Sequence, residues 1–299
     1  MDLETNKKSR LKVFLENPSK ALWSLAIPIM FGMGIQTCYN LVDMIFVGKL
    51  GGDAITGIAF NMPLFFLVLG LTMGLGTGVT AAIARFIGEE NKKQADNCAE
   101  HALLMAVIIS ITLSSIGLLF GKEILSLFGA EGEILNLGWE YLHVMCVGMP
   151  FMIFSGFFRS ILSGEGDMKF PMMVAGLGTI LNIILDPIFI FDLESLGGFG
   201  FGLGIAGAAM ATVISQVVVF IVFIFMLFFK NHSYISFNLS DFTFSTDIIW
   251  DIIKVGLPAS LSMIVMAVGQ GVFNKILVHI SVNTAVSYTH LRAHETIPD

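Results

Sequence analysis

The sequence predicts an all-α, polytopic membrane protein in which a six-helix lobe is followed by the first helix of a second, similar lobe. Of its 299 residues, 55% are hydrophobic and 13% are charged, whereas soluble proteins average about 25% charged residues. Apolar runs of about 20 residues or more, long enough to cross a bilayer, recur along the chain. These runs are predicted as helices because an open strand leaves its backbone polar groups unpaired in lipid.

Seven membrane helices can be placed in order, each on a long apolar run bounded by charged or turn-forming residues. The predicted spans are 21–47, 56–84, 99–120, 135–160, 170–192, 203–229 and 251–280. Their orientation follows from Lys and Arg, because cytoplasmic loops carry the excess of positive charge. With the N-terminus inside, twelve of these residues are cytoplasmic, and only Lys49 and Lys122 lie outside. We therefore predict a multi-pass protein of the cytoplasmic (inner) membrane with its N-terminus inside.

A polar segment, residues 231–250, separates the first six spans from the seventh. Pro258 in the seventh span lies 230 residues after Pro28 in the first, and internal repeats of this kind are typical of transporters. The repeat predicts about twelve spans, of which seven are present. Phe273 stands in the second copy where the first has Asp43, so this acid is not duplicated.

The chain is accordingly divided into four segments. They are a cytoplasmic tail with the first lobe (1–230), a cytoplasmic linker between lobes (231–250), the first helix of a truncated second lobe (251–286), and a tail (287–299). The tail, SYTHLRAHETIPD, loses the membrane composition and resembles the translation of a sequencing adapter, so it is left out of the fold prediction. A genuine tail would instead favour a seven-span receptor.

The first span carries a single carboxylate, Asp43, in an otherwise apolar helix. Asn40, Tyr39 and Gln36 precede it by three, four and seven residues, so all four side chains lie on one stripe of the helix. A charge at this depth costs roughly 2.5–3.5 kcal/mol and by default marks a functional site. The alternative is a hydrated residue at the membrane boundary.

The fifth span carries a second acid, Asp186, with Asn182 four residues before it. Both acid-bearing spans run from inside to outside, which places Asp43 and Asp186 at comparable depth in the outer half of the membrane. A shared site could carry protons, or its oxygen atoms could bind a small cation such as Na⁺. Thr212 in the sixth span could add a hydroxyl, although hydroxyls in membrane helices more often bond their own backbone. For Asp186 the alternative is a hydrated residue at a helix end before Pro187.

Several other function classes find no support in the sequence. It contains no HExxH motif, no phosphate-binding loop and no nucleophile with a nearby base, so an enzyme is not expected. No basic nucleic-acid footprint is present. Residues 202–207 read GxGxxG but run into a membrane helix without a βαβ unit, which argues against a dinucleotide cofactor. The three cysteines show neither zinc-site nor disulfide spacing.

Four features in combination resemble the multidrug and toxic compound extrusion (MATE) family. They are Pro28, Asp43 leading into VGKLG, the motif NIILDP, and GxGxxGAAMAT followed by Ser215-Gln216. The resemblance covers about residues 15–285. It implies twelve helices in two pseudo-symmetric lobes, and the export of organic cations in exchange for Na⁺ or H⁺.

The resemblance also implies roles for individual residues. Those matching the cation site of the first lobe, where Na⁺ or H⁺ would bind, are Asp43, Asn182, Asp186 and Thr212. Those assigned to the substrate cavity are Gln36 and Tyr39, with Asn40 beside them. Pro28 matches a proline that bends the first helix during gating, whereas a static kink is the alternative.

We therefore expect a Na⁺- or H⁺-coupled antiporter that exports organic cations or drugs by alternating access. It should work as a monomer in the lipid bilayer, with no cofactor besides the coupling ion and no nucleic-acid partner. The alternatives are a lipid-linked oligosaccharide flippase of the same superfamily, which basic residues in the cavity would favour, a seven-span receptor, and an ion channel.

Overall fold

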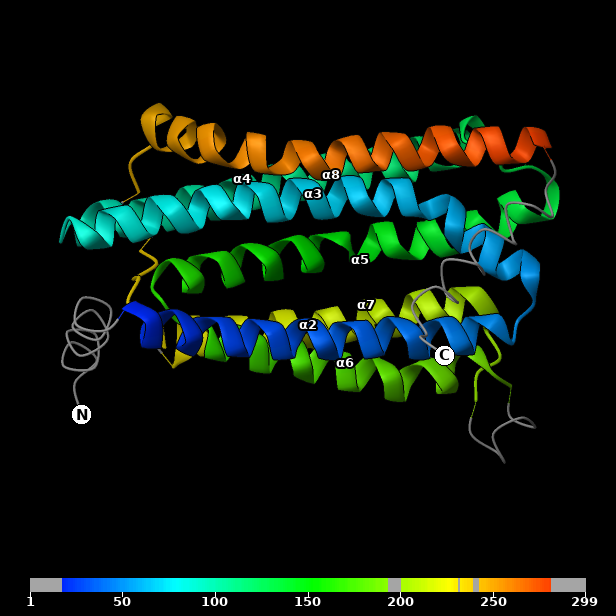
Figure 1. The fold of residues 1–299 in the computed structure, drawn as a ribbon, viewed down its shortest axis with the longest axis horizontal. Helices are drawn as coiled ribbons and strands as arrows, with labels where there is room; N and C mark the ends of the chain where they lie inside the picture. The colour runs from blue at the N-terminus through cyan, green and yellow to red at the C-terminus, as the bar shows by residue number, and fades with distance from the viewer. Residues whose placement is uncertain (1–17, 193–199, 231, 239–241, 281–299) are drawn as a thin grey trace.

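The computed structural model describes residues 18–192, 200–230, 232–238 and 242–280, apart from the side chains of 277–280 and of many positions between 18 and 40. In this part the chain forms seven long α-helices, which lie side by side along the long axis of the molecule (Figure 1). They are α2 (Pro18–Gly48), α3 (Gly52–Gly88), α4 (Lys92–Leu127), α5 (Gly132–Gly164), α6 (Lys169–Ile190), α7 (Gly204–Ile224) and α8 (Thr246–Ile280), with a π-helical turn η1 (Phe225–Phe229) after α7.

Six of the predicted spans each fall on one of these α-helices, and the span 203–229 falls on α7 together with η1. In the described part, α3 to α8 supply six helices that are long and apolar enough to cross a membrane. α2 has 31 residues. At a rise of 1.5 Å per residue it is about 46 Å long, more than the roughly 30 Å of a bilayer's hydrocarbon core. The all-α, polytopic fold class is confirmed.

α8 begins at Thr246, inside the segment predicted as a linker. Ser245 directly precedes this helix, and its Oγ accepts the backbone N–H of Ile248 at 3.5 Å, as the side chain of an N-cap residue does. Asp247 adds a negative charge in the first turn, which favours the N-terminal end of a helix. The segment outside the helix thus ends at Ser245, and Ser245 and Asp247 are the helix-starting signals at this boundary.

α5 occupies the middle of the bundle and packs against α3, α4 and α7 (Figure 1). Its fully buried side chains include Ile153, Phe157 and Ile161, which belong to the main apolar core. α6 packs on α7, α2 lies against α6, and α8 packs along α3. This arrangement brings α2, α6 and α7 together on one side of α5, where the candidate site lies.

α3 and α8 approach each other closely because small residues face each other between them. A Cβ atom added to Gly256 of α8 would lie 2.7 Å from Cα of Leu75, and one added to Gly74 of α3 would overlap Ser260. The Ser260 hydroxyl instead donates to the Gly256 carbonyl at 2.9 Å. Near one end of this contact, Arg85 and Asp251 form an ion pair at 2.6 Å. α8 is thus fixed against α3 by both packing and charge.

Candidate functional site

Asn182 and Asp186 lie one turn apart on α6, so their side chains share one face of the helix. This face is turned into the bundle, and the exposed fraction is 3% for Asn182 and 0% for Asp186. Nδ2 of Asn182 donates a hydrogen bond to Oδ1 of Asp186 at 3.1 Å. Burying a carboxylate costs free energy unless hydrogen bonds or a counter-charge stabilise it, so this one bond leaves the pair in need of further partners.

Thr212 of α7 lies beside this pair. Its Oγ1 accepts a longer hydrogen bond from Nδ2 of Asn182, at 3.4 Å. The contact follows from the packing of α7 against α6. Asn182, Asp186 and Thr212, all assigned to the cation site from the sequence, are thus joined by hydrogen bonds through the Asn182 amide.

Asp43, the fourth residue assigned to this site, comes from α2. It is half-buried, and its carboxylate lies close enough to Asp186 for the two charges to repel each other. The contact of α2 with α6 accounts for this proximity. The structure therefore places the two acids near each other, and their binding of a cation stays a prediction.

Tyr141 of α5 is a further polar side chain at the site, and the sequence did not single it out. It lies within electrostatic range of both Asp43 and Asp186. Its ring packs against a buried apolar cluster formed by Val47, Ala54, Ile190, Ile205 and Ala208. From the sequence alone, a tyrosine toward one end of a membrane helix is expected to be an interfacial residue. Only the packing of α5 against its neighbours brings Tyr141 within electrostatic range of the two acids.

Two acceptor atoms at the site are buried without a hydrogen-bond partner among the described residues. They are Oδ2 of Asp186 and Oδ1 of Asn182. Buried acceptors of this kind require an explanation, and a cation or a proton would satisfy both. With Asp43 and Thr212 nearby, the groups present are carboxylate, amide and hydroxyl oxygens, which are the ligands preferred by small hard cations. The residues thus fit a Na⁺ ion, and a proton on either acid fits equally well.

The substrate-cavity residues Gln36, Tyr39 and Asn40 and the bending residue Pro28 all belong to α2. The helix is continuous through these positions, so Gln36, Tyr39 and Asn40 keep their predicted spacing from Asp43 along one stripe of the helix. Their side chains lie outside the described part of the structure. Their roles therefore stay predictions.

Comparison with known proteins gives consistent results. A family model described as MatE matches residues 28–188, slightly more than half of the chain. A probable multidrug resistance protein of Bacillus subtilis, YoeA, is 29% identical over 291 residues, covering 96% of this chain and 60% of the relative. The multidrug export protein MepA of Staphylococcus aureus is 30% identical over 286 residues, covering 94% of this chain and 61% of the relative.

A solved structure gives the same result in three dimensions. It shows a multidrug resistance MATE family transporter of the MOP superfamily in an outward-facing conformation. It has a TM-score of 0.80 and 36% sequence identity, and the match covers 91% of this chain and 59% of the solved chain. The chain thus spans about 60% of the length of the relatives that it matches.

Proposed function

The chain belongs to the MatE family, and we propose that it forms the first lobe of a cation-coupled antiporter that exports organic cations or drugs. The family consists of transporters rather than enzymes. The two curated relatives are described as a multidrug resistance protein and a multidrug export protein. The substrate class proposed here follows theirs.

The observation that carries the proposal is the buried carboxylate of Asp186, which has an unpartnered oxygen atom and a second acid, Asp43, nearby. Asp186 has no exposed surface, and Asp43 repels it across the site. Two nearby carboxylates in a medium of low dielectric constant favour the uptake of a positive charge, either Na⁺ or H⁺. Uptake of the ion lowers the free energy of whichever conformation brings the acids together. Release of the ion makes that conformation less favourable.

Antiport follows when this ion binding and substrate binding favour opposite conformations. A ligand shifts a conformational equilibrium only by its difference in affinity for the two states. We assign ion binding to Asp43 and Asp186, with Asn182 and Thr212 completing the oxygen ligands. Gln36, Tyr39 and Asn40 would contact the substrate, and Pro28 would allow α2 to bend as the site fills and empties.

Transport driven by imposed ion gradients tests this proposal. Vesicles containing the protein are loaded with ethidium, an organic cation, and given a gradient of either Na⁺ or H⁺. We expect one of the two gradients to drive ethidium against its own gradient, and Asp186→Asn to abolish this transport. Glu140→Gln, which removes an exposed acid beside Tyr141, should leave it unchanged. Equal transport without either gradient would refute the coupling.

The flippase is the second and weaker candidate, because basic residues in the cavity would favour it and only one basic side chain lies within the six spans predicted for the first lobe. Arg159 of α5 is that residue, and it is half-buried. A single guanidinium can pair with one phosphate group. Transport of a lipid-linked sugar that is lost in Arg159→Ala, with no transport of ethidium, would favour the flippase.

A further inference from the structure

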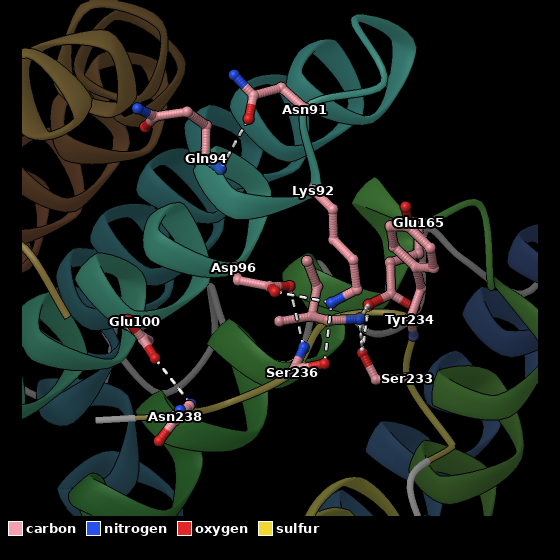
Figure 2. A network of polar contacts seen from close by, with 11 residues as sticks. Asn91, Lys92, Gln94, Asp96, Glu100, Glu165, Ser233, Tyr234, Ser236 and Asn238 are labelled. Atoms are coloured by element: carbon pink, nitrogen blue, oxygen red, sulfur yellow. Dashed lines mark hydrogen bonds and ion pairs between the residues drawn. The ribbon is translucent and has the colours of Figure 1, made fainter. Parts of the chain in front are cut away.

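Residues 232–238 and 242–245, which we call the strap, connect η1 to α8 along one end of the bundle. In the sequence this segment is a polar linker. In the structure it lies against the first turns of α4 and the end of α5 (Figure 2). Its backbone is not part of a helix or sheet, so its N–H groups need other acceptors.

Glu165, which directly follows α5, holds the first part of the strap. Its carboxylate accepts the hydroxyl of Ser233, the N–H of Tyr234 at 3.0 Å and the N–H of Ile235 at 3.1 Å. Hydrogen bonds to an ionised acceptor are stronger than those between neutral groups. The Ile235 side chain is 4% exposed and belongs to the main apolar core. This point of the strap is therefore held by both charge and burial.

Two acids of α4 hold the next part of the strap. Asp96 accepts the N–H of Ser236 at 3.0 Å, and Glu100 accepts the N–H of Asn238 at 2.9 Å (Figure 2). Four residues of a helix rise about 6 Å, and two residues of an extended chain rise about 6.6 Å. Acids spaced i and i+4 on α4 thus match alternate N–H groups of an extended strap. Because Asp96 and Glu100 accept backbone N–H groups, this pairing does not depend on the side chains of the strap.

The last part of the strap is fixed by Asn97 and His101 of α4. The Asn97 amide donates to the Thr243 carbonyl at 2.9 Å and accepts the Thr243 N–H at 3.3 Å. The Ser245 N–H lies 2.9 Å from Nε2 of His101, which must therefore be the acceptor. Nδ1 then carries the proton and donates it to the Asn97 carbonyl at 2.8 Å. Since Ser245 precedes α8, these bonds set where α8 begins.

We propose that the strap stays docked on the first lobe at all times. It acts as a clamp that fixes the start of α8 on α4, rather than as a flexible tether between the lobes. Asp96, Glu100 and Glu165 bind its backbone, and Asn97 and His101 bind its end. The Arg85–Asp251 ion pair holds the next turn of α8 to α3. Movement between lobes then takes place beyond the first turns of α8.

The reactivity of a cysteine placed at Ile235 tests this proposal. In permeabilised membranes, Ile235→Cys should react with a maleimide about 100-fold more slowly than in the denatured protein, because labelling requires the strap to open. Adding Glu165→Ala removes the acceptor of three donors and should raise the rate about tenfold, which corresponds to about 1.4 kcal/mol. Asp96→Asn should raise the labelling rate by a smaller factor than Glu165→Ala does. Peptide mass spectrometry measures each cysteine separately.

Two controls show whether a change is specific to the strap. Glu123→Ala removes an exposed acid near the end of α4 that lies away from the strap, and should leave the rate within about twofold. Cys146, which is fully buried in α5, should stay unlabelled in every variant if the bundle remains folded. If Glu165→Ala fails to accumulate, Ser233→Ala must still raise the rate, since it removes one of the same bonds.

Three results would overturn the proposal. The first is native-state labelling of Ile235→Cys as fast as in the denatured protein. The second is an unchanged rate in both Glu165→Ala and Asp96→Asn while Cys146 stays protected. The third is a rise of about tenfold in the labelling rate of Ile235→Cys when Na⁺ and tetraphenylphosphonium, an organic cation, are added. Such a rise would mean that the strap opens during the conformational cycle.

Discussion

The Asn182 amide lies 3.1 Å from Oδ1 of Asp186, one turn farther along α6, and the other oxygen of this carboxylate is buried without a partner among the described residues. The amide therefore orients the acid without neutralising it. An ionised group in this position is stabilised most by a small cation or a proton. This relationship is the basis of the predictions for the site.

Sodium binding should weaken as the pH falls. On the proposed assignment, protons and Na⁺ would neutralise the same carboxylates, so each would exclude the other. Binding of radioactive sodium to the purified protein, measured between acidic and alkaline pH, checks this. We expect an apparent dissociation constant for Na⁺ that rises steadily toward acidic pH. An affinity that is independent of pH would place sodium away from Asp43 and Asp186.

Asn182→Ala should reduce ion binding by about tenfold, as loss of groups that orient ion ligands commonly does. The substitution removes the donor to Asp186 and the link to Thr212. Asn182→Gln keeps the amide but moves it by one methylene, and should recover part of the affinity. Ion binding by Asn182→Ala at the level of the unmodified protein would show that the amide does not orient the acid.

Tyr141→Phe should lower the transport rate without reducing the amount of folded protein. The change removes only the hydroxyl near the two acids and keeps the ring that packs against the apolar cluster. We expect a loss of about two- to tenfold, equivalent to roughly 0.4–1.4 kcal/mol, because the hydroxyl is a polar group within electrostatic range of both acids. Transport of ethidium is the measurement. A variant that transports normally would make Tyr141 a packing residue only.

Gly256→Val should destabilise the contact between α3 and α8. The added side chain would meet the backbone of Leu75, which cannot move aside, so overpacking should cost about 1–3 kcal/mol. Thermal unfolding in detergent measures this loss. Gly269→Val on the same helix is the matched control, because a Cβ at Gly269 meets no atom within 4 Å. Equal stability of the two variants would contradict the close packing.

The sequence predicted the helices and the two acids because both signals are local. A membrane span is a continuous apolar run, and an acid within it is conspicuous, as Asp43 and Asp186 are. Tyr141 was missed because its partners come from α2 and α6, and no spacing along α5 indicates them. The strap was missed because Glu165 binds backbone N–H groups, which every residue except proline carries.

We propose that Asp43 and Asp186 act together on one ion, and a double-mutant comparison tests whether they do. Ethidium export is measured in cells producing the protein, Asp43→Asn, Asp186→Asn or the double variant. If both acids serve one site, each single variant should lose about as much export as the double variant, because residues that act as a unit are not additive. Normal export by either single variant, or losses that multiply in the double variant, would contradict the claim.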